Sequence, residues 1–315
     1  MTSFGDFKPL CSHTPSYPWC NLFYHQARPP SPLEFHNPST LVGVSANFSS
    51  APVGINPECG TLRVGSNGSL GNIANTIVCG LSFFITLGLI WLTNRRKAAV
   101  GRFELQIFLV MYLITLPLQI LTTGSFLEQG SNALAILTAI HAGSVAALFW
   151  ALLGNAIVAT QVVEDGTISS LVPFMFFALA FFVATTYISL DVAFTFTRTF
   201  GPSSPPEALT SVPVFVLTSI WPGAAALIYF ITMSYIVIGQ LREFRPMAYY
   251  ALAAILFILS QLDYFLLNQV ICNGTNAGVD GSFVATILET ACVFVLYRAW
   301  KSITEESWDD NIYYR

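Results

Sequence analysis

The main pattern along this chain is a series of seven long apolar runs separated by short polar joints. Each run is about 19–28 residues long, enough to cross a hydrocarbon core of roughly 30 Å as a helix. Backbone amides cannot stay unpaired in lipid, and the runs lack the alternation of barrel strands, so helices are predicted. The pattern therefore predicts an all-α, polytopic membrane bundle. Its seven expected transmembrane helices are Ile73–Thr93, Phe103–Thr123, Ala133–Thr160, Leu171–Leu190, Val212–Gly239, Met247–Gln269 and Ser282–Trp300.

These runs divide the chain into three parts. We expect an N-terminal tail at 1–71, the seven-helix bundle at 72–300 and a short acidic tail at 301–315. The N-terminal tail is rich in Pro, Ser, Gly and Asn, which predicts a loop-rich cap rather than a packed domain. Its opening residues lack the basic start and apolar core of a cleavable signal peptide, so the first helix is expected to act as the targeting signal.

Composition agrees with a membrane protein. Apolar residues make up 54% of the chain and charged residues 10%, whereas a soluble domain carries roughly 25% charged residues. The lipid bilayer is therefore the expected surrounding. A net charge of −4 favours neither a nucleic-acid-binding protein nor a basic membrane-surface protein.

Basic residues predict the orientation of the bundle. Short joints on one side contain only Arg198, so the positive-inside rule places the N-terminal tail in the lumen and the C-terminus in the cytosol. Three N-glycosylation sequons, at Asn47, Asn67 and Asn273, all fall on the predicted lumenal side, and Asn47 is the best-placed acceptor. The basic residues of the predicted cytosolic side are Arg95, Arg96, Lys97, Arg102, Arg242, Arg245, Arg298 and Lys301.

Cysteine usage is consistent with an oxidising compartment. Cys11, Cys20, Cys59 and Cys272 lie on the predicted lumenal side, where four cysteines allow three pairings. We favour Cys11–Cys20, which closes a short local loop, together with Cys59–Cys272, which would attach the tail to the joint before the last helix. Free buried thiols are the alternative.

The third predicted helix has a stripe of small residues at four-residue spacing. Small side chains at this spacing let helix backbones approach closely, which predicts that this helix lies in the centre of the bundle. A groove that binds a partner is the alternative interpretation. The stripe consists of Ala135, Ala139, Gly143, Ala147 and Ala151.

Ionisable residues inside predicted spans are the usual sign of chemistry in a membrane protein. His141, Asp263 and Glu289 are three such residues, in the third, sixth and seventh helices. At 1.5 Å per residue, all three lie roughly 9–12 Å below the lumenal boundary. We therefore expect them to share one polar cluster. A structural hydrogen-bond network is the interpretation we favour, and a proton or substrate path and catalysis are the alternatives.

The signatures of several enzyme and receptor classes are missing. A zinc hydrolase needs several intramembrane ligands, and only one of the four histidines lies in a span. No serine elbow or Gly-rich phosphate loop occurs, and the seventh helix has no lysine for retinal. The sequence therefore predicts no enzyme, no catalytic residue, no metal site and no cofactor.

Several stretches resemble the fungal chitin synthase export chaperones, and the likeness extends over essentially the whole chain. The first stretches open the chain and the last closes it. They are Phe4-Gly5-Asp6-Phe7 through Leu10-Cys11, Pro18-Trp19-Cys20-Asn21-Leu22, Gly101-Arg102-Phe103-Glu104-Leu105-Gln106, the run from Leu137 to Thr167, Ser260-Gln261-Leu262-Asp263 and the run from Lys301 to Asp310.

The resemblance implies a multi-pass protein of the endoplasmic reticulum membrane without catalytic activity. Its expected role is to help a chitin synthase fold and leave the reticulum, which supports chitin synthesis at the cell wall. The expected partner is a multi-pass chitin synthase, with no nucleic acid and no cofactor. A seven-helix transporter or receptor that uses the polar cluster is the alternative.

The C-terminal tail is acidic. One interpretation is a solvated, disordered end. The other is a docking segment for vesicle coat proteins or for basic cytosolic surfaces of the synthase, because short acidic peptides suit basic grooves. The acidic residues are Glu305, Glu306, Asp309 and Asp310.

Overall fold

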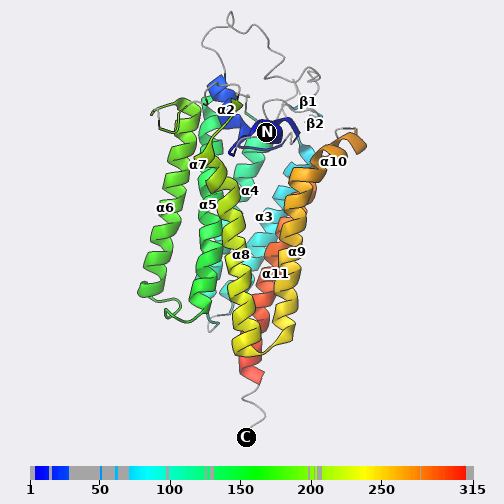
Figure 1. Cartoon of the computed structure of the whole chain (residues 1–315). Coiled ribbons are helices and arrows are strands. Elements are labelled where there is room, and N and C mark those ends of the chain that lie inside the picture. Colours follow the sequence, from blue (N-terminus) through cyan, green and yellow to red (C-terminus); the bar gives the residue numbers. More distant parts are fainter. Residues whose placement is uncertain are drawn as a thin grey trace, which may run out of the picture.

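The computed structural model describes residues 4–13, 16–27, 50–51, 61–62, 71–96, 99–124, 126–127, 131–197, 199–201, 203, 208–276 and 278–309. Within these residues, seven helical spans are long and apolar enough to cross a membrane, so the predicted seven-helix fold is confirmed. The spans run side by side along one long axis (Figure 1).

Five of the seven spans are single α-helices. The first four are α3 (Ile73–Asn94), α4 (Arg102–Thr123), α5 (Asn132–Ala159) and α6 (Ile168–Phe194), and the last is α11 (Gly281–Asp309). Outside the bundle lie two short helices, α1 (Lys8–His13) and α2 (Cys20–Ala27), and an antiparallel pair of strands, β1 (Ser50–Ala51) and β2 (Thr61–Leu62).

The fifth and sixth spans contain π-helical segments. The fifth consists of α7 (Val212–Phe215), η4 (Val216–Ile220), α8 (Trp221–Ser234) and η5 (Tyr235–Leu241). The sixth consists of α9 (Phe244–Leu262), η6 (Asp263–Leu267) and α10 (Asn268–Gly274). Single π-turns inside α-helices are frequent at functional positions, and η6 begins at Asp263, one of the residues that the sequence singles out.

The observed helix ends differ from the apolar runs mainly where polar residues continue a helix. Helix α6 ends at Phe194 rather than Leu190, and Asp191 lies in its last turn. The Asp191 carboxylate is buried and accepts hydrogen bonds from the backbone and hydroxyl of Thr197, which close the end of this helix. Apolar length alone does not reveal such an end.

Helix α5 is the span with the most neighbours in the bundle. It packs against α4, α6 and α8, and it is the most buried of the seven spans. In Figure 1 it lies between α6 and α8. The whole stripe is buried, which lets the neighbouring backbones approach α5 closely.

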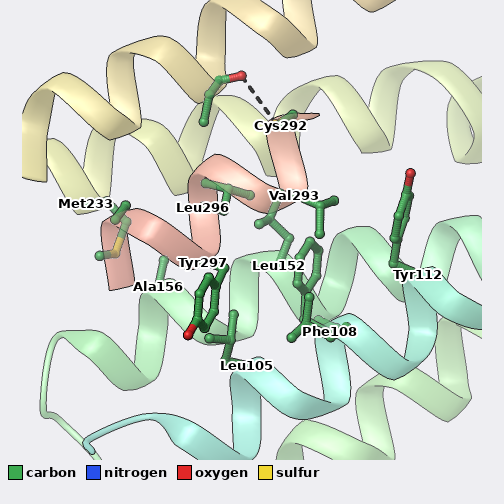
Figure 2. Close-up of a cluster of buried hydrophobic side chains, with 14 of the residues drawn as sticks. Leu105, Phe108, Tyr112, Leu152, Ala156, Met233, Cys292, Val293, Leu296 and Tyr297 are labelled. Atoms are coloured by element: carbon green, nitrogen blue, oxygen red, sulfur yellow. Dashed lines mark hydrogen bonds between the residues drawn. The ribbon is translucent and has the colours of Figure 1, made fainter. Parts of the chain in front are cut away.

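One hydrophobic core fills the half of the bundle toward the end of α11. Figure 2 shows side chains of α4, α5 and α11 meeting there, with Met233 contributed by α8. The Cys292 thiol donates to the backbone carbonyl of Ala253 at 3.3 Å, which attaches α11 to α9. The labelled apolar members of this core include Leu105, Phe108, Leu152, Ala156, Val293, Leu296 and Tyr297.

A second core forms at the opposite end of the bundle, around the N-terminal residues 4–13 and 16–23, which we call the N-terminal plug. Its aromatic side chains Phe7, Tyr17, Trp19 and Phe23 are buried. Backbone hydrogen bonds join the plug to the segment before α7, from Phe7 N to Leu209 O at 3.0 Å and from Ser211 N to Gly5 O at 3.0 Å. The described residues of the plug are thus packed against the bundle, and the loop-rich cap expected for the whole of 1–71 stays a prediction.

Close packing of α5 on α6 gives a direct test of this arrangement. A Cβ atom added at Gly143 would collide with the hydroxyl of Thr186 and would lie 2.7 Å from the carbonyl oxygen of Phe182. We expect Gly143→Ala to lower the free energy of unfolding by about 1–3 kcal/mol, because the α6 backbone must move away. Thermal unfolding in mild detergent measures the change.

Gly80 of α3 provides the matched control. A Cβ atom added there meets nothing within 4 Å. The same Gly→Ala change should leave stability unchanged or raise it by up to about 1 kcal/mol, since Ala is the better helix former. Equal effects at the two positions would contradict the packing argument.

Candidate functional site

The intramembrane histidine joins the plug to the bundle. His141 of α5 is buried, and its Nδ1 lies 3.1 Å from the hydroxyl of Thr122 in α4. The ring of Trp19 in the plug packs over the imidazole, with 5.1 Å between ring centroids. His141 therefore connects three segments of the chain through one hydrogen bond and one aromatic contact.

The two intramembrane carboxylates have different surroundings from the histidine. Glu289 of α11 accepts a long hydrogen bond of 3.5 Å from the side-chain amide of Gln261 in α9. Asp263 is buried at the first residue of η6, and its Oδ2 atom has no hydrogen-bond partner among the described residues. The three predicted residues thus have separate partners, and one shared cluster stays a prediction.

A ladder of uncharged polar groups crosses the bundle between α3, α4 and α11. At its upper level, the hydroxyl of Thr286 donates to Asn75 Oδ1 at 2.9 Å and accepts from Gln119 at 3.0 Å. The Asn75 amide donates to the hydroxyl of Thr123 at 3.3 Å. Interhelical hydrogen bonds in membranes are worth roughly 0.6–2 kcal/mol each, so this level binds three helices together.

The ladder continues one turn further along α11. The hydroxyl of Thr290 donates to Ser82 of α3 at 2.7 Å and lies 2.8 Å from the hydroxyl of Tyr112 in α4. Sequence reasoning missed these residues because it examined ionisable groups, whereas hydroxyls are common in apolar helices. The amide of Asn75 inside an otherwise apolar run was the available signal.

A buried glutamate holds the other end of the bundle, where α4 begins. Glu104 of α4 is fully buried, and its Oε1 accepts hydrogen bonds from Gly166 N at 3.0 Å and from the hydroxyl of Ser170 at 2.7 Å. Asp165 accepts from Gly101 N at 2.9 Å. The α5–α6 joint is thereby attached to the start of α4 by two carboxylates.

Two glycines make this attachment sterically feasible. Gly101 and Gly166 have φ values of +68° and +66°, which L side chains rarely adopt. The indole of Trp300 in α11 donates to Val100 O at 2.9 Å and adds the last helix to the same end. Most of these residues belong to the stretches that carry the family resemblance, so those stretches lie together in space. We call the contacts of Glu104 with Gly166 and Ser170, and of Asp165 with Gly101, the Glu104 interlock.

An aspartate caps the start of α11 at the plug end of the bundle. Asp280 precedes the helix, and its Oδ1 accepts from Ser282 N at 3.1 Å, as an N-cap does. Its Oδ2 accepts from the Asn72 amide at 3.4 Å, and Asn268 Oδ1 accepts from Gly281 N at 3.2 Å. Burial raises the pKa of the Asp280 carboxyl, while hydrogen bonds to the carboxylate oppose that rise.

Cysteines and sequons are only partly described. Cys11 and Cys20 form a disulfide with a Cα–Cα distance of 5.7 Å, which is the favoured local pairing. Cys272 is also disulfide-bonded, whereas Cys59 lies outside the described residues, so that pairing stays a prediction.

Asn273 is exposed in the last turn of α10. Asn47 and Asn67 lie outside the described residues.

The acidic end of the chain continues the last helix. Helix α11 extends through Asp309 and includes Glu305 and Glu306, so this part of the backbone is helical. Asp310 lies outside the described residues.

Taken residue by residue, the buried polar groups connect helices. Among the described residues, no three His, Cys, Asp or Glu side chains gather as a metal site. Carboxylates, amides and hydroxyls instead pair across α3, α4, α5, α9 and α11. The fold and this arrangement define a multi-pass membrane protein whose polar interior serves helix association.

Comparison with known proteins identifies the family. Residues 3–313 match the family described as Chitin synthase export chaperone, and the chain belongs to this family. No solved structure is significantly similar to the chain.

Relatives with the same name occur in several fungi. The chain is 25% identical over 309 residues to the chitin synthase export chaperone of Phaeosphaeria nodorum, covering 98% of this chain and 85% of the relative. It is 22% identical over 311 residues to that of Kluyveromyces lactis, covering 98% and 95%. It is 28% identical over 260 residues to that of Cryptococcus neoformans, covering 82% and 70%.

The interlock at Glu104 predicts a specific loss of stability. Glu104→Ala removes the acceptor of the Gly166 amide and the Ser170 hydroxyl, and leaves both groups without this partner. We expect the free energy of unfolding to fall by about 1–3 kcal/mol, the usual cost of unpaired buried polar groups. Thermal unfolding in detergent measures it.

Glu164→Ala in the same joint is the matched control. The Glu164 side chain is exposed, and the hydrogen bond at this residue, from the Thr167 hydroxyl, goes to its backbone carbonyl. This control should unfold like the wild type. An equally large loss from both substitutions would show that charge on this joint matters and that the buried carboxylate does not.

Proposed function

We propose that this chain is a dedicated membrane chaperone for the folding and export of a chitin synthase from the endoplasmic reticulum. The proposal rests on one observation above all, which is that the family match covers residues 3–313, nearly the whole chain. The client in this proposal is a multi-pass chitin synthase, and cell-wall chitin is the downstream product.

A chaperone for a membrane protein needs surface that is free within the lipid. The α6 span and the span at 212–241 are the least buried inside the bundle, together with the sixth. The outer face of α6 carries exposed apolar side chains such as Phe176, Leu179 and Val183. Such a face suits transient contact with apolar helices of an unfinished client, whose polar groups are costly when they remain unpaired in lipid.

The stable interior supports the same role. The hydrogen bonds between α3, α4 and α11 and those of Glu104 Oε1 hold the helices to one another. A chaperone with this interior binds its client through its outer helix faces without unfolding itself.

Removing the protein should trap the client. In a strain that lacks it, we expect the chitin synthase to stay in the reticulum, aggregated, with less chitin at the wall and unchanged synthase transcript. Fractionation and fluorescence imaging of tagged synthase measure the distribution. Re-expression of this chain should restore export, and normal surface delivery of every chitin synthase in the deletion strain would reject the proposal.

We also propose that the N-terminal plug faces the lumen and the C-terminus the cytosol. The basic joints and the sequons support this orientation. Glycosidase should change the mobility of the wild-type protein, and Asn47→Gln should remove most of that change. In sealed microsomes the N-terminal tail should resist added protease. Cleavage of the tail without detergent would reverse the assignment.

The acidic end is proposed to dock with vesicle coat proteins or with basic cytosolic surfaces of the synthase. Truncation after Ile303 should spare insertion and stability, because the apolar part of α11 remains, but it should slow client export. Pulse-chase measurement of client exit, at matched protein levels, tests this expectation.

A full-length control separates charge from length. The four substitutions Glu305→Gln, Glu306→Gln, Asp309→Asn and Asp310→Asn keep the tail and remove its charge. They should slow export as much as the truncation does. Wild-type export kinetics in both variants would leave the tail without a transport role.

A further inference from the structure

A group of buried oxygen atoms lies where the plug meets the bundle. Asp280 caps α11 and accepts from the amide of Asn72, just before α3. The backbone of Asp263 passes against the start of α11, since a Cβ atom added at Gly281 would lie 2.9 Å from the Asp263 carbonyl oxygen. Ser16 of the plug is held here by the Tyr264 hydroxyl, which donates to its carbonyl oxygen at 2.6 Å. We call Asp263, Asp280, Asn72 and Ser16 the aspartate site.

Two of these four residues carry side-chain oxygens without hydrogen-bond partners in the described chain. They are Asp263 Oδ2 and Asn72 Oδ1, whereas the Ser16 hydroxyl faces the Asp280 carboxylate. Asp263 and Asn72 are only 5% and 3% exposed, so bulk water does not satisfy these oxygens. Buried polar atoms are almost always hydrogen-bonded, and each exception calls for an explanation.

The aspartate site also brings two carboxylates together in a buried position. Asp263 and Asp280 are close enough to repel each other, and Asp280 is fully buried. Within the described residues, the Oδ2 atom of Asp263 has no hydrogen-bond partner. An isolated buried carboxylate is strongly unfavourable, so a positive charge must reach this site as a cation or as a proton.

We propose that the aspartate site binds a divalent cation of the calcium class through Asp263, Asp280, the amide oxygen of Asn72 and the hydroxyl of Ser16. Calcium takes oxygen ligands from carboxylates, amides and hydroxyls in flexible geometry. The donors here are all oxygens, with no thiolate or imidazole that would favour zinc or copper. A shared proton would satisfy one carboxylate, but it would leave the amide oxygen of Asn72 without a partner.

Such a cation would have a structural consequence. The four residues come from the plug, from the start of α3, from η6 and from the cap of α11. A cation at their centre would fasten the N-terminal plug to three spans of the bundle. This inference goes beyond the chaperone role and stands independently of it.

The test uses the purified full-length protein in detergent. Equilibrium dialysis with radioactive calcium should give about one ion bound per chain, and calcium should raise the melting temperature by roughly 2–4 °C over a chelator baseline. Asp263→Asn should abolish both effects. Glu289→Gln, an intramembrane carboxylate with its own donor in Gln261, should retain them.

Two further variants keep the test decisive if Asp263→Asn folds poorly. Ser16→Ala removes one neutral ligand and should weaken calcium binding several-fold. Asn72→Asp adds a carboxylate, so it should tighten calcium binding and lower the melting temperature in chelator. Magnesium at the same concentration should stabilise the protein less, because it demands near-ideal octahedral geometry.

Several results would overturn the proposal. The first is wild-type protein that binds no stoichiometric calcium, and the second is Asp263→Asn protein that binds as much calcium as the wild type. A third is Asp263→Asn protein that is more stable than the wild type at neutral pH regardless of calcium, which would assign a shared proton to the site. None of these results bears on client export, so the chaperone proposal would stand or fall separately.

Discussion

Hydrocarbon offers no hydrogen bonds, so every polar group within the bundle must find its partner inside the protein. The structure meets this constraint by bringing helices close together around α5 and by placing amides and hydroxyls opposite one another. Asn75, Thr286 and Gln119 form one level of the ladder, and Ser82, Thr290 and Tyr112 the next. The close approach of α6 to α5 depends on the missing side chain at Gly143, because a Cβ atom there would collide with α6. Several buried polar atoms of the described residues lack a partner, Asp263 Oδ2 and Asn72 Oδ1 among them, and these two oxygens motivate the proposed cation site.

The two ends of the bundle are closed by different devices. At one end the α5–α6 joint is attached to α4 through Glu104 and Asp165, and Trp300 adds the last helix. At the other end the N-terminal plug inserts its aromatic side chains, and Asp280 caps α11. Both sets of contacts join segments that lie far apart in the sequence. They therefore help to determine which spans are neighbours in the bundle.

A rigid interior with freely exposed helix faces fits a protein that assists another membrane protein. The polar groups of the described spans mostly pair with one another, and the outer faces of α6 and α8 remain open to lipid or to a client. Membership of the chitin synthase export chaperone family names the class of client. The geometry adds that the chaperone's own stability resides in contacts separate from those faces, which lets stability and client binding be altered independently.

The amino-acid sequence by itself determined the number of spans, their positions within a few residues and the central place of the small-residue helix. Apolar length and the spacing of small side chains act locally along a helix, so they are readable without a structure. Only the tertiary structure decided which polar groups meet. Glu104 pairs with Gly166 and Ser170, 62 and 66 residues away, and Ser16 lies 248 residues from the tyrosine that holds it. The partners of His141 and Glu289 could not be read from the sequence for the same reason, because the packing of whole helices determines which hydrogen-bonding groups meet.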